Sequence, residues 1–191
     1  LAEVRESLTE IVENDKRASE VIRRLRAMLR KEPLDHQPLA ANDVVHDVLK
    51  LMHSDLLNRR VAVTLDLAGD LPVIKGDRVQ LQQVLLNLVV NACDAMRETA
   101  GERAIHISSR LDAGTSVELS VSDLGHGIAE GELERIFTPF VTTKSEGIGL
   151  GLAICRTIVQ AHRGKLWASN NAGAGATFHF TLPVPVPPPA V

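Results

Sequence analysis

The chain has 191 residues, a formal net charge of −3 and 24% charged residues, which is typical of one soluble core with at most a small appendage. The near-neutral charge argues against a nucleic-acid-binding protein. No run approaches the roughly 18 consecutive apolar residues of a membrane span. We therefore expect no membrane contact from this segment, and a cytoplasmic location.

Residues 3–31 are predicted to form one long helix. Apolar residues recur there at alternating spacings of three and four, which is the heptad pattern of a helix that packs against another helix. The seam consists of Leu1, Val4, Leu8, Ile11, Ala18, Ile22, Leu25 and Leu29. Pro33 ends the helix. Because the sequence offers no second heptad helix, the partner helix is expected in another chain or upstream of Leu1.

The periodicity changes after a linker at residues 32–38. Asn42 is predicted to cap a helix that runs to about Asn58. The alternation over residues 61–67 predicts a strand. Asp77 is predicted to cap the next helix, which is apolar over most of its surface.

Polar residues form one narrow stripe on that apolar helix. Asn87, Asn91 and Asp94 lie at i, i+4 and i+7 within the otherwise apolar run 85–96. A helix with apolar remaining faces is expected to be buried, where an unpaired polar group costs about 1–3 kcal/mol. The stripe is therefore expected to face another polar element, a metal or a ligand.

The second half of the chain is predicted to contain two hairpins, a helix and a long irregular segment. The elements are strands 104–111 and 116–124, the irregular segment 125–148, a helix at 150–161, strands 165–169 and 176–182, and a Pro-rich tail. Strands with two or three helices on one face make an α+β sandwich. Cys93 and Cys155 fall in predicted buried helices without metal-type spacing, so both are expected to be reduced core thiols.

Two glycine-containing motifs flank the irregular segment. Asp123-Leu124-Gly125-His126-Gly127 ends a strand, where a carboxylate can accept a hydrogen bond from an exocyclic amine and glycines let backbone approach a flat group. A β-turn with an Asx cap is the alternative reading. Gly147-Ile148-Gly149-Leu150-Gly151 opens a helix, whose N–H groups can bind an anion. A flexible helix entry is the alternative here.

Other side chains of the irregular segment fit the same interpretation. Thr142, Thr143 and Lys144 supply hydroxyl groups and an ammonium group beside the anion site, which suits a polyphosphate, although a solvated loop would have the same composition. Phe137 and Phe140 are expected to anchor the segment by packing.

Taken together, these motifs resemble the N, G1, F and G2 boxes of sensor histidine kinases. They occur in the order Asn-x₃-Asn-Ala-x₂-Ala, Asp-x-Gly-x-Gly, Phe-x-Pro-Phe and Gly-x-Gly-Leu-Gly-Leu. Two further segments, Phe140-Val141-Thr142-Thr143-Lys144 and Gly175-Ala176-Thr177-Phe178, look like those of the kinases that commonly carry PAS sensors. These kinases belong to the GHKL ATPases, with Hsp90, gyrase B and MutL. The resemblance covers roughly residues 38–182. It implies a two-layer α/β sandwich of the Bergerat type, with a mixed sheet covered by helices on one face.

The resemblance also implies a domain organisation and partners. Residues 1–32 would be the second helix of the dimerisation and phosphotransfer hairpin, 33–182 the catalytic ATP-binding domain, and 183–191 a disordered tail. The implied ligands are ATP and Mg²⁺. The implied protein partners are a response-regulator receiver domain and, through the helical hairpin of the full-length protein, a second copy of the chain.

Roles for individual residues follow from the same resemblance. Asn91 is similar to the family's Mg²⁺ ligand, and Asn87 would lie near the phosphates. Asp123 would bind the adenine amino group, with Gly127 allowing close approach and Thr177 behind it. Residues 125–148 would form a lid over ATP. The expected catalytic residues are Asn87, Asn91 and Lys144, and the expected nucleotide-binding residues are Asn87, Asn91, Asp94, Asp123, Gly125, Gly127, Ile128, Thr142, Thr143, Lys144, Gly147, Gly149, Leu150, Gly151 and Thr177.

The residue at position 87 separates the branches of this family. The Hsp90 and gyrase branch has a water-activating Glu there, whereas Asn cannot act as a base near neutral pH. The expected function is transfer of the ATP γ-phosphoryl group to a histidine and then to a response-regulator Asp. None of the seven histidines has the position of the acceptor, so this chain is expected to bind Mg·ATP without phosphorylating itself. The alternatives are a GHKL-fold protein-serine kinase, an ATP-dependent clamp and an inactive scaffold.

Overall fold

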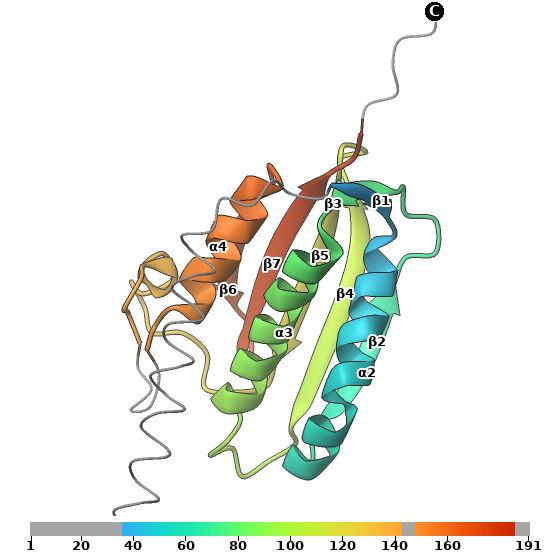
Figure 1. The fold of residues 1–191 in the computed structure, drawn as a ribbon. Helices are drawn as coiled ribbons and strands as arrows, with labels where there is room; N and C mark the ends of the chain where they lie inside the picture. The colour runs from blue at the N-terminus through green and yellow to red at the C-terminus, as the bar shows by residue number, and fades with distance from the viewer. Residues whose placement is uncertain (1–35, 143–147, 186–191) are drawn as a thin grey trace, which may run out of the picture.

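The computed structural model describes residues 36–142 and 148–185, which form two layers (Figure 1). The helices are α2 (Ala41–Arg59), α3 (Arg78–Ala95) and α4 (Gly151–Ala161), with a 3-10 turn, η1, at Arg135–Phe137. The predicted heptad helix and residues 186–191 of the predicted tail lie outside the described residues.

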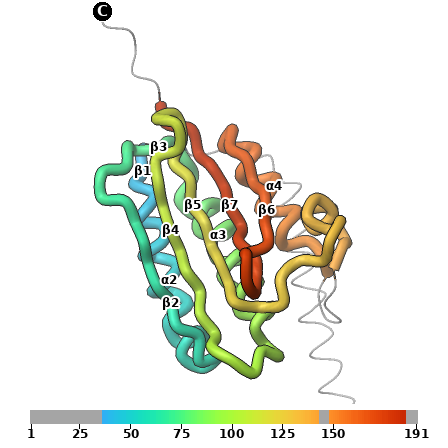
Figure 2. Tube along the Cα trace, turned by 180° about the vertical axis from the view of Figure 1, so that it is seen from behind, coloured from blue at the N-terminus to red at the C-terminus, as the bar shows by residue number. Residues whose placement is uncertain are grey.

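One mixed sheet forms the second layer. Its strands are β2 (Ala62–Leu67), β4 (Ala104–Asp112), β5 (Ser116–Asp123), β6 (Leu166–Asn170) and β7 (Ala176–Pro183). They are ordered β2-β4-β5-β7-β6, with β2 and β4 parallel and the other neighbours antiparallel. Figure 2 shows this sheet from the side that the helices leave uncovered. The predicted fold class, a mixed sheet with helices on one face, is confirmed.

The core lies between the sheet and the helices. Alternate residues of β5, namely Val117, Leu119 and Val121, point toward the helical layer and are almost completely buried. The middle helix α3 meets them with side chains such as Leu85 and Leu88, which are equally buried. Both α2 and α4 pack against α3, so this helix has neighbours on three sides. That burial explains the nearly continuous apolar run of its sequence.

Two short strands were not predicted. β1 (Gln37–Leu39) and β3 (Ile74–Gly76) pair antiparallel in a sheet of their own, and β1 occupies the end of the predicted linker. A strand of three residues is too short to show the alternation by which strands are recognised, and Pro38 is tolerated because it lies in an edge strand.

The predicted cap at Asn42 is wrong. Helix α2 begins at Ala41, and its N-cap residue Ala40 makes no side-chain capping bond. The Asn42 side chain instead donates to Ala68 O at 2.9 Å and accepts from Ser109 Oγ at 2.8 Å, which ties α2 to the sheet. The Asp77 cap is confirmed, since its carboxylate accepts bonds from the N–H groups of Val79 and Gln80.

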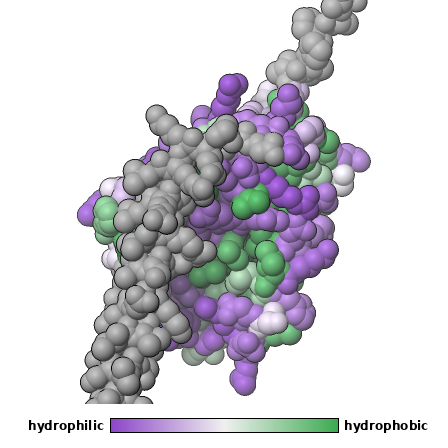
Figure 3. All heavy atoms as spheres, in the orientation of Figure 1, coloured by the Kyte–Doolittle hydropathy of each residue, from purple (hydrophilic) through white to green (hydrophobic). Residues whose placement is uncertain are grey.

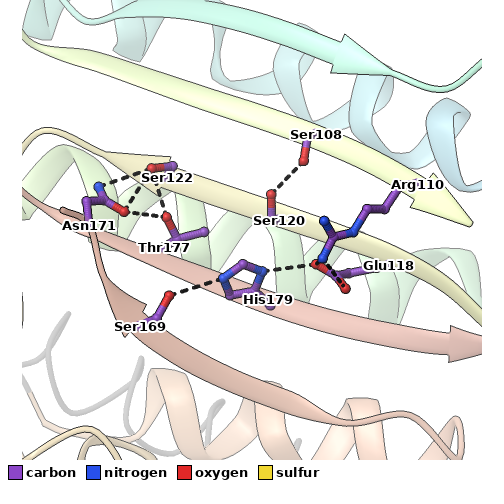
Figure 4. A network of polar contacts seen from close by, with 9 residues as sticks. All are labelled: Ser108, Arg110, Glu118, Ser120, Ser122, Ser169, Asn171, Thr177 and His179. Atoms are coloured by element: carbon purple, nitrogen blue, oxygen red, sulfur yellow. Dashed lines mark hydrogen bonds and ion pairs between the residues drawn. The ribbon is translucent and has the colours of Figure 1, made fainter. Parts of the chain in front are cut away.

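The uncovered face of the sheet carries polar side chains. Figure 4 shows the network around Glu118, a buried carboxylate that accepts bonds from Arg110 at 2.8 and 3.0 Å and pairs with His179 at 3.1 Å. The His179 ring also contacts Ser169 and stacks on Trp167, with 5.1 Å between ring centroids. These partners offset the cost of burying a charge on a face without helices.

Where grey atoms do not cover it in Figure 3, the outer surface of the helical layer is largely hydrophilic, with some hydrophobic side chains gathered near the middle of the view. This is expected for helices that turn one stripe toward a sheet and the opposite side toward water. Among the helices of the described residues, none is long and apolar enough to cross a membrane.

A buried histidine joins α4 to the start of α3. His162 Nε2 accepts a bond from the backbone N–H of Asp77 at 2.9 Å, while Nδ1 lies 2.8 Å from Ile158 O. Both bonds form only in the neutral ring with its proton on Nδ1. Burial lowers the pKa of His162 below its ordinary value, because the protonated ring would be desolvated and would lose the Asp77 bond.

This depressed pKa predicts a pH-dependent stability. Below about pH 6.5 the unfolded chain protonates position 162 before the folded chain does, so stability should fall as pH drops from about 6.5 toward the folded pKa. Thermal unfolding between pH 7.5 and 5 measures the effect, and the slope should be smaller in His162→Gln. His53→Gln, at an exposed position of α2, is the matched control and should keep the wild-type slope. Equal slopes in all three proteins would contradict the assignment.

Candidate functional site

The polar stripe of α3 extends between two glycine-mediated contacts. Near its middle, Asn87 lies close to the Cys155 thiol of α4, and a Cβ atom added at Gly151 would lie 3.9 Å from Asn87 Oδ1. At its end, Gly125 packs so closely that a Cβ atom there would lie 2.6 Å from Ala95 O. Eight residues of helix separate Asn87 from Ala95, about 12 Å. The stripe therefore connects the start of α4 with the turn after β5.

Asp123 lies at the second of these contacts, at the end of β5. Its side chain is buried, and Oδ1 accepts bonds from the N–H groups of Gly125 at 2.8 Å and Ala176 at 3.4 Å. Burial raises the pKa of the Asp123 carboxyl, and these two N–H groups oppose that shift by stabilising the charged form. Both bonds go to Oδ1, which leaves Oδ2 as the oxygen available to a hydrogen-bond donor.

Glycines surround this carboxylate where no side chain would fit. A Cβ atom at Gly175 would lie 1.9 Å from Asp123 O and 2.9 Å from Asp123 Oδ1. Gly175 and Gly127 also have φ angles of 86° and 73°, a region that favours glycine. The glycines recognised in the sequence are thus required by the close approach of β5, the β6–β7 turn and the turn after β5.

The irregular segment after Gly127 is fixed at several points. Phe137 in η1 is buried, lies edge-on to Phe178 with 6.3 Å between centroids, and carries the Arg156 guanidinium over its ring. Near the second glycine motif, Phe140 N–H donates to Gly149 O at 3.0 Å. Phe137 therefore anchors the segment as predicted, whereas the Phe140 side chain is exposed and packs little.

The predicted site residues differ in burial and in the partners that they contact. Leu150 is buried at the start of α4, and Ile128 is half-buried at the start of the irregular segment. Asp94 forms an ion pair with Arg59 of α2 at 2.9 Å, so its carboxylate also has a structural role. Asn91 lies on α3 one turn from Asn87. Predicted residues outside the described part of the chain are Thr143, Lys144 and Gly147.

Thr177 does not lie behind Asp123 as predicted. Along β7 the side chains alternate between faces, and the Thr177 hydroxyl bonds Ser122 Oγ at 2.9 Å and Asn171 Oδ1 at 2.6 Å on the uncovered face of the sheet (Figure 4). The neighbour of the Asp123 carboxylate is Ala176, one residue earlier. A shift of one residue along a strand moves the side chain to the opposite face of the sheet, and the sequence motif does not show which of the two residues faces Asp123.

Two asparagines, Asn170 at the end of β6 and Asn171 at the start of the β6–β7 turn, were missed by the sequence analysis. Asn170 makes two bonds to Ile128, and Asn171 donates to Asp123 O at 2.9 Å. Their only signal in the sequence is a position next to a Gly-rich turn, which is the ordinary place for Asn.

Neither cysteine belongs to the site chemistry. Burial raises the pKa of Cys93 to about 11 and that of Cys155 to about 12, so both thiols stay protonated near neutral pH, as expected for core residues. Within the described residues, no cluster of three or more His, Cys, Asp or Glu side chains is placed to hold a metal ion.

Comparison with known proteins identifies this arrangement. A family model described as histidine kinase-, DNA gyrase B- and HSP90-like ATPase matches residues 76–186. The catalytic domain of the histidine kinase ThkA is 36% identical, with a TM-score of 0.67, over 75% of this chain and 95% of that domain. The chain therefore belongs to this ATPase family and contains the catalytic, ATP-binding domain of a sensor histidine kinase.

Longer relatives match as well. The sensor histidine kinase TmoS of Ectopseudomonas mendocina is 35% identical over 96% of this chain, which spans 19% of TmoS. Full-length ShkA, solved in complex with AMPPNP, matches 97% of this chain and 40% of its own with a TM-score of 0.81 and 25% identity. ThkA in complex with the response regulator protein TrrA matches 93% of this chain and 49% of its own, at 30% identity and a TM-score of 0.74.

The close contacts of the glycines around Asp123 predict that one added methyl group at Gly175 strongly destabilises the fold. Gly175→Ala should lower the free energy of unfolding by about 3 kcal/mol or more, because the new Cβ would overlap Asp123 O at a φ that strains alanine. Gly173→Ala, two residues earlier with open space around its Cα, is the control and should change stability by less than about 1 kcal/mol. Urea unfolding of both variants measures the difference. Equal stabilities would show that the turn can move away from Asp123.

Proposed function

We propose that this chain binds Mg·ATP along the polar stripe of α3, with the base at Asp123 and the phosphates at the start of α4. The observation that carries the proposal is the spacing of the two ends. Asp123 and Gly125 lie beside Ala95, and Gly151 lies beside Asn87, about 12 Å further along α3. A nucleoside triphosphate can span this distance with its base at one end and its phosphates at the other.

The base end fits an adenine. Asp123 Oδ2 would accept a bond from the exocyclic amine while Oδ1 keeps its two backbone N–H donors. A hydrogen bond to a buried carboxylate is worth about 1.5–3 kcal/mol. Gly125 and Gly127 present bare backbone next to it, which lets a flat ring approach.

The phosphate end fits an anion with a bound cation. The N–H groups in the first turn of α4 lack intrahelical partners and point toward the start of the helix, where the helix dipole favours negative charge. Asn91 would offer its amide oxygen to Mg²⁺, whose other positions are filled by phosphate oxygens and water. The bound Mg·ATP supplies the phosphoryl group, while the protein orients it and excludes competing acceptors.

Position 87 favours a histidine rather than water as the acceptor. The Asn87 side chain has no basic atom with which to activate water. In the full-length protein the γ-phosphoryl group would go to a histidine of the dimerisation hairpin and then to an aspartate of a response regulator. Support for this partner comes from the resemblance to ThkA, which has been solved with its response regulator protein TrrA. The proposal keeps the boundaries expected from the sequence, with residues 1–32 as part of the hairpin and 33–182 as the ATP-binding domain.

Removing the charge of Asp123 tests the base end. Asp123→Asn keeps an oxygen for the two backbone N–H groups but turns an NH₂ group toward the adenine amine. Affinity for Mg·ADP should fall by about tenfold or more, which titration calorimetry measures. The melting temperature without nucleotide should stay equal or rise, because burial no longer acts on a charge.

Asp66→Asn, at an exposed position of β2, is the control for this substitution and should keep wild-type affinity. Unchanged affinity in Asp123→Asn would contradict the proposed adenine contact. Failure of the wild-type chain to bind Mg·ADP or Mg·ATP would favour the inactive scaffold.

Incubation with labelled ATP tests the acceptor. We expect hydrolysis far slower than the ~1–10³ per second of typical enzymes, and no acid-labile label on this chain. The exposed His46 and His53 lie on α2, which α3 separates from the start of α4 (Figure 1). His162, His106 and His179 are held in hydrogen bonds within the fold. Fast hydrolysis would favour the ATP-dependent clamp. Phosphorylation of a serine in an added protein would favour the serine kinase. Acid-labile label on the chain alone would overturn the assignment of the acceptor to another segment.

A further inference from the structure

The turn between β6 and β7 contacts the first residue after the Asp-x-Gly-x-Gly motif. Asn170 Oδ1 accepts a bond from the backbone N–H of Ile128 at 2.8 Å, and Asn170 Nδ2 donates to Ile128 O at 2.7 Å. One side chain thus satisfies both backbone groups of one residue, as a neighbouring strand would. We call this pair of bonds the Asn170 clamp.

The clamp fixes the backbone on the far side of Gly127. On the near side, the Asp123 carboxylate holds the N–H of Gly125 at 2.8 Å. Between these two attachments Gly127 has a φ of 73°, and a Cβ atom added there would lie 3.1 Å from Asn170 Oδ1. The turn that would face the adenine is therefore held at both ends, once by Asp123 and once by Asn170.

The neighbouring Asn171 has a different set of partners. Its Nδ2 donates to Asp123 O at 2.9 Å and to Ala174 O at 3.1 Å, and its Oδ1 accepts from the Thr177 hydroxyl at 2.6 Å. These contacts join β5, β7 and the turn itself, and Figure 4 shows Asn171 beside Ser122 and Thr177. Asn171 therefore supports the sheet, whereas both clamp bonds of Asn170 go to the segment after Gly127.

Asn170 contributes little to the core. Its side chain is exposed, and the clamp bonds lie at the surface. Residues of this kind can be replaced without loss of the fold, since burial supplies most of the stability of a domain. The effect of such a clamp is instead to narrow the conformations of a turn before a ligand arrives, which removes part of the ordering cost of binding.

We propose that Asn170 is a positioning residue for the adenine end of the nucleotide site, acting through the backbone of Ile128 and Gly127. The inference rests on the proposed function, because it assigns the turn after Asp123 to the base of a bound nucleotide. It adds a residue from the end of β6, outside the four motifs that indicated the site in the sequence.

The test measures nucleotide affinity in the 191-residue chain by titration calorimetry. Asn170→Ala should lower the affinity for Mg·ADP and for Mg·ATP by the same factor, about three- to tenfold. The factor should be the same because the substitution loosens the turn at the base and leaves the phosphate-binding end of the site unchanged. Asn170→Asp keeps an acceptor for the Ile128 N–H and loses the donor to Ile128 O, so it should recover part of the affinity. Asn58→Ala, at an exposed position of α2, is the matched control and should bind as the wild type does.

Two further readouts separate positioning from a general loss of structure. The melting temperature without nucleotide should be unchanged in Asn170→Ala and lowered in Asn171→Ala. Amide exchange at Ile128 should speed up in Asn170→Ala and stay slow in Asn170→Asp. A wild-type affinity in Asn170→Ala, or a loss of affinity only in proportion to a lowered melting temperature, would overturn the inference. A wild-type chain that binds no nucleotide would instead overturn the proposed function.

Discussion

The site depends on one constraint, the burial of the Asp123 carboxylate at the end of β5. A buried carboxylate costs free energy unless hydrogen-bond donors surround it. Here the donors are the backbone N–H groups of Gly125 and Ala176, and they reach Oδ1 only because no side chain stands at Gly125 or Gly175. The glycines are therefore required by the fold as well as by a ligand, and the raised pKa of Asp123 shows that burial still outweighs the two donors.

Helix α3 connects this carboxylate to the rest of the site. It is packed by α2, α4 and the sheet, so the side chains that it turns toward them are apolar. In its polar stripe, Asp94 forms an ion pair with Arg59 of α2, and Asn87 lies close to Cys155 and Gly151 of α4. The same stripe thus contacts both neighbouring helices and lines the proposed nucleotide-binding site. This double use explains why amides, which are satisfied by either kind of partner, occur in so apolar a helix.

The two faces of the sheet cooperate at the β6–β7 turn. Hydroxyl and amide groups on the uncovered face, from Ser122, Thr177 and Asn171, hold the turn against β5. On the other side of the same turn, Gly175 closes over Asp123 and Asn170 reaches Ile128. A network that faces away from the site therefore sets the position of groups that form it. This is possible because the side chains of consecutive residues in a strand point to opposite faces of the sheet.

The sequence by itself determined the fold class, the buried α3 with its stripe, the Asp77 cap and the glycine motifs, because these follow from periodicity and from residue types with few other uses. It did not determine β1, β3, the anchoring of Asn42 to Ala68 and Ser109, or the face on which Thr177 lies. It also gave no reason to choose Asn170 and Asn171 from other turn asparagines. Tertiary structure decided these, since each depends on which distant segment lies opposite: Ile128 is 42 residues from Asn170, and Asp123 is 48 from Asn171.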